Sequence, residues 1–252
     1  MSGWAIYQAT KKKHDFFFNT YVMRPIAAYV VAWVAPTGIT PNQVTLASQI
    51  VFVGAAAALI ALPSYAGGLL AVGLIQLSYC FDCVDGMLAR HKKIASKTGH
   101  LFDFFTDESK ALMLVAGTAI RLFRTGGWGY DAREWQALDY RFLLAGIVGV
   151  FAVASATSLT NFVRRPELSG REQQVEAHYE TVGPEKPKSL VGKGAALVFG
   201  VFRLVAHYPS HIVIVAALGC FDLFFWVYAA LHVLYLGRGW LGLFMRFGVR
   251  GE

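Results

Sequence analysis

Residues 79–107 decide the fold, and they read YCFDCVDGMLARHKKIASKTGHLFDFFTD between two apolar stretches. Four aspartates stand in this segment: Asp82, Asp85, Asp103 and Asp107. An aspartate at the middle of a membrane helix costs about 2.5–3.5 kcal/mol on insertion scales. Four carboxylates in two adjoining apolar segments therefore need a compensating charge. The segment predicts two membrane helices that share a charged site.

The spacing of the aspartates predicts where their side chains meet. Asp82 and Asp85 are three residues apart and Asp103 and Asp107 are four apart, so each pair shares one face of a helix. The polar connection between the two helices is short, which makes the helices antiparallel neighbours. Both pairs then lie within a few turns of the same membrane surface, at a rise of about 1.5 Å per residue. The four carboxylates are expected to converge at one depth.

Composition places the chain in a membrane. Of its 252 residues, 56% are hydrophobic and 15% are charged. Soluble chains average about 45–50% apolar and about 25% charged residues. The net charge of +7 is divided among short clusters between the apolar runs, which favours an anionic lipid surface as partner and argues against nucleic acid. Cys80 and Cys83 form a CxxC inside an apolar helix, with no second pair for zinc, and are interpreted as small buried hydrophobes.

Six apolar segments approach the roughly 20 residues that a membrane crossing needs. They run from about 42 to 62, 66 to 90, 99 to 123, 140 to 163, 190 to 206 and 211 to 236. The fifth is marginal because Lys193 and Arg203 interrupt it. An alternative lays it in the membrane interface and splits the last segment near Cys220-Phe221-Asp222. The prediction is an all-α integral membrane protein with one domain over residues 1–252, in which residues 39–240 form a bundle of about six transmembrane helices.

Residues 1–38 are expected to form a cytoplasmic and interfacial segment. Between 14 and 34, Asp15 and Arg24 are mixed with aromatic and aliphatic residues, which is typical of an amphipathic helix in the headgroup layer. The alternative is an ordinary helix packed on the bundle. The basic clusters at 11–13, 91–93, 164–165, 186–193 and the C-terminus share one side if six spans alternate. The positive-inside tendency makes that side cytoplasmic, in a multi-pass protein of the cell or inner membrane.

Oxygen-only ligation selects hard divalent cations, so the aspartates predict Mg²⁺ or Mn²⁺. Four negative charges could balance two such ions, an arrangement that suits phosphoryl chemistry. Gly86 lets a phosphate approach the backbone, Ala89 keeps the same face shallow, and Arg90 offers a bidentate fork. The alternative is a set of hydrated aspartates at helix ends, paired with Arg90, Lys92 and Lys93.

The whole pattern is D-x2-D-G-x2-A-R-x8-G-x3-D-x3-D, from Asp82 to Asp107. It resembles the signature of the CDP-alcohol phosphotransferase (CDP-alcohol phosphatidyltransferase) family at every fixed position. The stretch Thr40-Pro41-Asn42-Gln43-Val44-Thr45, at the start of the first span, is similar to that family as well.

The resemblance implies roles for particular residues. Asp82, Asp85, Asp103 and Asp107 would bind the metals, and Asp107 would also deprotonate the acceptor hydroxyl. The CDP donor would be held by a larger set, namely Pro41, Asn42, Gln43, Thr45, Asp82, Gly86, Ala89, Arg90, Ser96 and Gly99. The family reaction releases CMP, and a homodimer is implied.

Substrate choice is less determined by the sequence. We favour CDP-diacylglycerol as donor and a small or phosphorylated alcohol as acceptor, although a soluble CDP-alcohol with a lipid acceptor is an alternative. The basic residues that could bind a phosphorylated acceptor are Lys110, Arg164, Arg165 and Lys193. They could equally serve membrane topology alone, and Glu108 follows Asp107 where a basic residue would have helped an anionic acceptor.

Two other functions remain open at this level. A divalent-cation transporter also carries intramembrane carboxylates, but it needs them through the bilayer depth, and here only Asp222 lies away from the cluster. A catalytically silent member of the family is disfavoured because no signature residue is lost.

Overall fold

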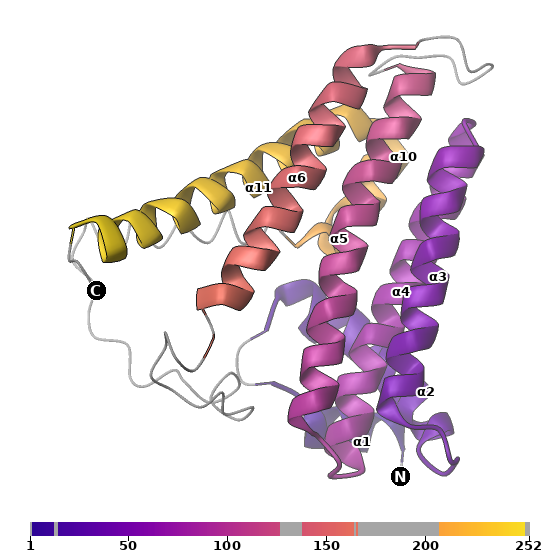
Figure 1. The fold of residues 1–252 in the computed structure, drawn as a ribbon. Coiled ribbons are helices and arrows are strands. Elements are labelled where there is room, and N and C mark those ends of the chain that lie inside the picture. Colours follow the sequence, from indigo (N-terminus) through magenta and orange to yellow (C-terminus); the bar gives the residue numbers. More distant parts are fainter. Residues whose placement is uncertain (1, 13–14, 127–137, 164, 166–206, 250–252) are drawn as a thin grey trace, which may run out of the picture.

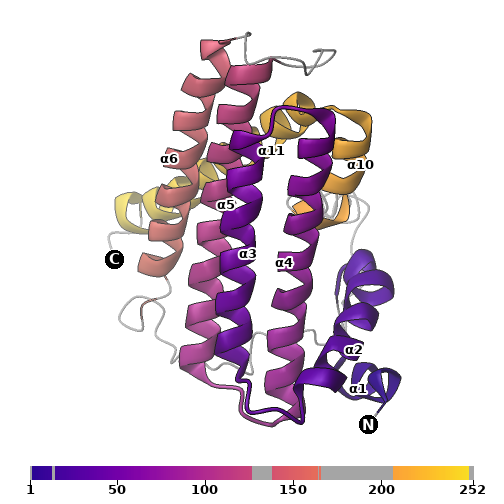
Figure 2. The ribbon, with the colours of Figure 1, turned by 90° about the vertical axis from the view of Figure 1, so that its right-hand side faces the viewer.

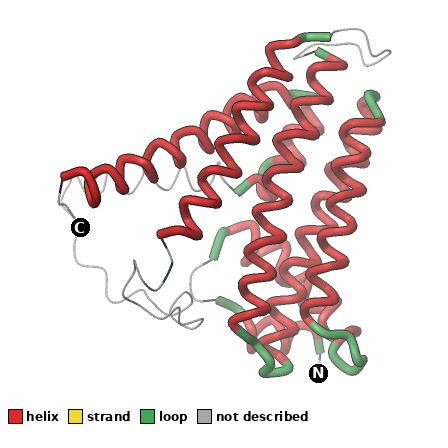
Figure 3. The backbone as a smooth tube through the Cα atoms, in the orientation of Figure 1, coloured by secondary structure: helices red, strands yellow, loops and turns green. Residues whose placement is uncertain are grey.

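The computed structural model describes the chain except for residues 1, 13–14, 127–137, 164, 166–206 and 250–252. All regular structure in the described part is helical, and that part contains no strand (Figure 3). This confirms the predicted all-α class.

Three long helices form the centre of the bundle (Figure 1): α3 (Pro41–Ala61), α4 (Tyr65–His91) and α5 (Lys97–Thr125). Helix α3 packs against both α4 and α5. Its start is set by a capping box, in which Thr40 and Gln43 satisfy each other's backbone N–H groups, and by Pro41 at the first helical position. Ser64 caps α4 and Ser96 caps α5 in the same way, by accepting a hydrogen bond from a backbone N–H. These caps fix the turns that bring the signature helices together.

Three described helices are long and apolar enough to cross a membrane: α3, α4 and α6 (Tyr140–Val163). Large apolar side chains point outward from them, such as Ile50, with 63% of its surface exposed, and Phe151, with 66%. An apolar exterior of this kind is typical of a surface that faces lipid. The chain therefore has the helices of a membrane protein, while the full count of about six spans stays a prediction.

The third predicted span corresponds to α5, which has 29 residues and is long enough to cross, although its charged residues lower its hydropathy. The fifth predicted span, residues 190–206, lies outside the described residues. The sixth, 211–236, is divided into α10 (Ile212–Leu218) and α11 (Phe221–Leu243), as the splitting alternative predicted. The reason is Gly219, whose φ of 68° is left-handed and ends the first helix.

The remaining described elements complete the bundle. Helix α6 packs on α5 and α11, and the 3₁₀ turn Tyr208–Ser210 leads into α10 beside α4. A π-helical segment, Phe244–Val249, continues α11. In the described part Cys80, Cys83 and Cys220 are buried free thiols, as interpreted for the first two.

The N-terminal segment covers one side of α4 at the signature end (Figure 2). It consists of α1 (Gly3–Thr10), the π-helical turn Asn19–Met23 and α2 (Arg24–Val34). Ala27, Ala28 and Val31 are buried in the cluster that joins α2 to α4. On the opposite face, Ile26, Tyr29 and Trp33 are exposed. The helix thus packs on the bundle and keeps an apolar stripe outward, and its placement in the headgroup layer stays a prediction.

Candidate active site

Three of the four aspartates meet in space. One carboxylate oxygen from each of Asp82, Asp85 and Asp103 lies within 4.8 Å of the other two. Asp85 is the most buried, with 4% of its surface exposed, and Thr45 of α3 donates a hydrogen bond of 2.6 Å to it. We name Asp82, Asp85 and Asp103 the carboxylate cluster. Like charges this close repel one another, so the cluster needs a cation.

The chemistry of the carboxylate cluster fits a divalent ion. Its ligand atoms are all carboxylate oxygens, the set that Mg²⁺ and Mn²⁺ prefer. The Oδ1 atom of Asp103 is buried and has no hydrogen-bond partner among the described residues. A buried acceptor without a donor is costly, and coordination of a cation would satisfy it. The cluster could therefore hold a metal ion.

The fourth signature aspartate has different surroundings. Asp107 is outside the cluster, and 53% of its side chain is exposed. The buried ammonium of Lys110 lies 3.2 Å from Asp107 Oδ1 and 2.5 Å from Asp82 Oδ1. Lys110 thus joins Asp107 to the edge of the cluster and supplies one compensating positive charge. The predicted role of Lys110 in binding an acceptor stays a prediction.

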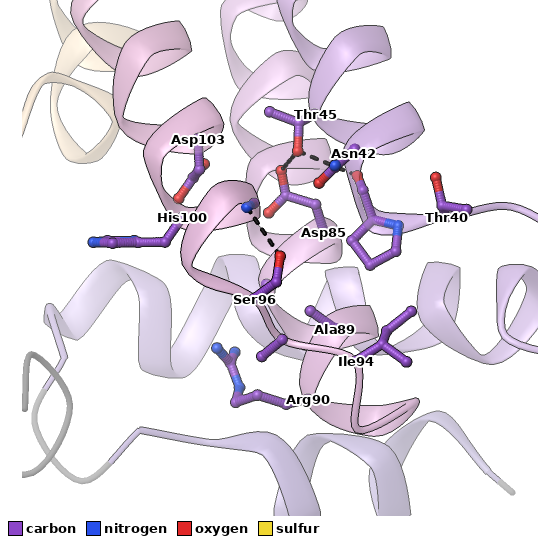
Figure 4. Close-up of a pocket in the computed structure, with 14 residues that line it drawn as sticks. Thr40, Asn42, Thr45, Asp85, Ala89, Arg90, Ile94, Ser96, His100 and Asp103 are labelled. Atoms are coloured by element: carbon purple, nitrogen blue, oxygen red, sulfur yellow. Dashed lines mark hydrogen bonds between the residues drawn. The ribbon is translucent and has the colours of Figure 1, made fainter. Parts of the chain in front are cut away.

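A pocket of about 460 Å³ opens beside the cluster (Figure 4). Asp85, Asp103 and Thr45 lie at its inner end, whereas Ile94 and Arg90 lie toward the other end. The lining residues come from α3, α4, α5 and the α4–α5 connection, namely Thr40, Pro41, Asn42, Thr45, Asp85, Gly86, Ala89, Arg90, Ile94, Ala95, Ser96, Gly99, His100 and Asp103. We name this space the signature pocket, because it collects both sequence stretches that carried the resemblance.

Arg90 is held in part by the backbone of α1. The Nε atom of Arg90 donates a hydrogen bond of 3.2 Å to the carbonyl oxygen of Thr10, the last residue of α1. Its guanidinium also lies over Gly86, since a Cβ atom added there would sit 3.4 Å from Arg90 Nη1. The N-terminal segment therefore positions a fork of donors at the mouth of the signature pocket.

Close packing explains a second glycine of the signature. A Cβ atom added at Gly99 would lie 3.1 Å from Ser96 Oγ and 3.2 Å from Asn42 Oδ1. Ser96 Oγ accepts the Gly99 N–H at 3.0 Å, which begins α5. The absence of a side chain at Gly99 lets α5 start directly against α3 and keeps Ser96 and Asn42 at the pocket wall.

Most residues predicted to bind the donor line the signature pocket, but two do not. Gln43 caps α3 by accepting the Thr40 N–H at 2.9 Å, and Asp82 lies in the cluster without lining the pocket. Of the predicted acceptor residues other than Lys110, Arg165 is exposed just beyond α6, and Arg164 and Lys193 lie outside the described residues. The predicted acceptor set therefore stays a prediction.

Sequence reasoning assigned no role to several residues at this end of the bundle. His100 and Thr40 line the pocket, and both had a signal, because each adjoins a signature residue. Lys12 had none. Its burial, with Arg24 and Arg90 nearby, lowers the pKa of the Lys12 ammonium. Lys12 and Arg24 therefore add positive charge near Arg90, and Asp15 offsets part of it through its ion pair with Arg24.

The fold and site define a class of membrane protein with an acidic centre, which could hold a metal ion, at the inner end of a pocket that Arg90 also lines. Comparison with known protein families matches residues 38–234 to the family described as CDP-alcohol phosphatidyltransferase. The match covers most of the chain, so the chain belongs to the CDP-alcohol phosphatidyltransferase family. Membership makes it an enzyme of phospholipid synthesis that transfers a phosphoalcohol from a CDP-alcohol to an alcohol acceptor in a membrane. Among curated proteins, none shows a significant match.

The open space around Gly86 leads to the first prediction. Gly86→Ala should stabilise α4, because alanine in a helix interior is favoured over glycine by up to about 1 kcal/mol. The added methyl group would stand in the signature pocket beside Arg90, so affinity for a CDP-alcohol should fall about tenfold. Thermal unfolding and a donor titration measure the two effects. Gly73→Ala, in the same helix with open space around its Cβ position, is the control and should leave donor affinity unchanged.

Proposed function

We propose that the protein transfers a phosphatidyl group from CDP-diacylglycerol to the hydroxyl of an acceptor alcohol, with Mg²⁺ or Mn²⁺ bound by the aspartates. The observation that carries this proposal is the meeting of the carboxylate cluster with the inner end of the signature pocket. A CDP moiety in that pocket would place its pyrophosphate between the carboxylates and Arg90. Two ions would suit four acidic side chains, with Asp107 as a further ligand.

The reaction can be written with its atoms in balance. The acceptor oxygen attacks the phosphorus that carries the diacylglycerol, and the bond from that phosphorus to the bridging oxygen of CMP breaks. The acceptor proton passes to Asp107, a carboxylate accessible enough to receive it. When bound, the metal neutralises charge on the phosphates. Arg90 steadies the departing CMP, because a guanidinium fork matches phosphate geometry.

Placement in the cell follows from charge. At the signature end of the bundle, Lys11 and Lys12 follow the end of α1, and Lys92 and Lys93 follow the end of α4. This charge favours the cytoplasmic side for the active site. The apolar exterior of α3 would let the acyl chains of the donor stay in the bilayer. A homodimer, implied by the family resemblance, is part of the same proposal.

The test is an assay of CMP release by the purified protein in lipid. With Mn²⁺ and CDP-diacylglycerol, a panel of alcohols should include at least one that releases CMP, and a chelator should stop the release. A soluble CDP-alcohol with diacylglycerol is the parallel arm. Release in that arm alone would replace the donor assignment, and cation flux without release in either arm would favour a transporter.

A further inference from the structure

A second pocket lies on the other side of α5 from the signature pocket. It has a volume of about 640 Å³ and is enclosed by α5, α6, α11 and the π-helical end of α11. Helix α5 stands between the two pockets, since it packs on α3 on one side and on α6 and α11 on another (Figures 1 and 2). Asp103 lines the first pocket and Glu108 lines the second. We name the second space the Glu108 pocket.

One polar group of the Glu108 pocket is a carboxylate with several apolar neighbours. Glu108 is half-buried among walls that include Val153, Leu159 and Val163. Thr157 donates a hydrogen bond to its Oε2 atom. Within the described ranges Glu108 forms no ion pair. A carboxylate in a membrane helix is costly without a cationic partner.

The neighbours of Glu108 are also acceptors. His232 Nδ1 lies 2.9 Å from the carbonyl oxygen of Tyr228, so that nitrogen carries the hydrogen and Nε2 of the neutral ring can accept. The Thr160 hydroxyl donates its hydrogen to the Ala156 carbonyl at 2.8 Å, which leaves its lone pairs available. The single hydroxyl hydrogen of Thr157 is likewise donated within the protein, to Glu108 or to the carbonyl oxygen of Val153. The polar atoms in this part of the pocket are therefore hydrogen-bond acceptors, and a ligand group with several N–H donors would complement them.

Two basic residues also line the Glu108 pocket. Arg238 comes from α11, and Arg246 comes from the π-helical segment that continues it. Arg238 follows His232 by six residues, or about 9 Å along a helix. The lining of the Glu108 pocket therefore contains both a carboxylate and guanidinium groups.

Position links this pocket to the reaction. Glu108 directly follows Asp107, and consecutive side chains of a helix point about 100° apart, so the two carboxylates leave α5 on adjoining faces. An ammonium held by Glu108 could present a hydroxyl two carbons away toward Asp107. We infer that the Glu108 pocket binds the acceptor, and that the acceptor is an alcohol bearing an ammonium group, such as an amino alcohol or a hydroxy amino acid. This assignment rests on the proposed function, and it replaces the basic residues first expected to select a phosphorylated acceptor.

The experiment compares acceptors of matched size in the CMP-release assay. The pairs are 2-aminoethanol with ethylene glycol and serine with glycerate, in which a hydroxyl replaces the ammonium, and glycerol 3-phosphate is the anionic acceptor. The amine of each pair should show a kcat/KM at least tenfold above its partner. Glu108→Gln should lower kcat/KM for the amines about tenfold to a hundredfold, the range for a hydrogen bond to a charged group, and mainly through KM. The same variant should lower kcat/KM for the diol far less than for the amine, because a hydrogen bond between two charged groups is stronger than one from a neutral hydroxyl.

Several outcomes would overturn the inference. One is equal turnover of the amine and its matched diol, and another is an equal loss with Glu108→Gln for both. Turnover of glycerol 3-phosphate alone would contradict the acceptor class while leaving the proposed function intact. If no alcohol releases CMP, the proposed function fails.

Thermal unfolding then tests the Glu108 pocket by itself, because a ligand that binds the folded protein raises its unfolding temperature. An unfolding temperature of the wild type that rises no more with 2-aminoethanol than with ethylene glycol would reject the ammonium site. Thr157→Ser, which keeps the hydroxyl, is the control for packing in the pocket.

Discussion

Asp103→Asn should reduce turnover at least about 10²–10³-fold, the cost typical of removing one preorganised electrostatic group, while making the metal-free protein more stable. The two effects have one cause. In the carboxylate cluster, Asp103 repels Asp82 and Asp85, and its buried Oδ1 atom has no hydrogen-bond partner in the described part of the chain. A neutral amide relieves that repulsion and weakens the site for a divalent ion.

Thermal unfolding with and without Mn²⁺ separates these effects. A ligand present at 100 times its dissociation constant adds about 2.7 kcal/mol to the stability of the wild type. Without Mn²⁺, Asp103→Asn should unfold at a higher temperature than the wild type. Addition of Mn²⁺ should raise the unfolding temperature of the variant much less than that of the wild type. Asp139→Asn is the matched control, because its exposed pair with Arg141 stands at the far end of the bundle. A normal Mn²⁺ gain and normal turnover in Asp103→Asn would exclude the cluster as the metal site.

Asp107→Asn should have the second large effect, of a different kind. A positioned general base contributes about 10²–10⁴-fold to rate, so the single-turnover rate should fall by that factor. Donor affinity and stabilisation by Mn²⁺ should survive in large part, because Asp107 lies outside the three-carboxylate cluster and contacts Lys110.

The decisive comparison measures donor affinity, Mn²⁺ stabilisation and single-turnover rate for Asp107→Asn and Asp103→Asn in the same lipid. Equal loss of all three in both variants would make Asp107 a metal ligand only, with no role as the base. A different group, such as a donor phosphate oxygen, would then have to take the acceptor proton. A rate near wild type in Asp107→Asn would remove it from the chemistry altogether.

The short-range sequence pattern predicted much of the acidic site. The spacing of the signature aspartates within each helix and the short connection between the helices predicted that carboxylates would meet, and three of them do. Local capping explains why the helix starts were also predictable, since Ser96 and the Thr40–Gln43 box act over three residues. Gln43 shows the limit of resemblance, because the same residue that matched a binding motif is occupied by this cap.

What the sequence by itself determined, then, is the all-helical membrane class, the family and the acidic centre, because periodicity, composition and spacing act along one or two helices. Only the tertiary structure decided the contacts between distant segments. Thr45 reaches Asp85 across 40 residues, and Arg90 is held by the carbonyl of Thr10 across 80. The packing of α6 and α11 against α5 forms the Glu108 pocket. Glu108 is a candidate determinant of acceptor choice only because it lines this pocket. No local pattern encodes such contacts, because each depends on how separate helices pack.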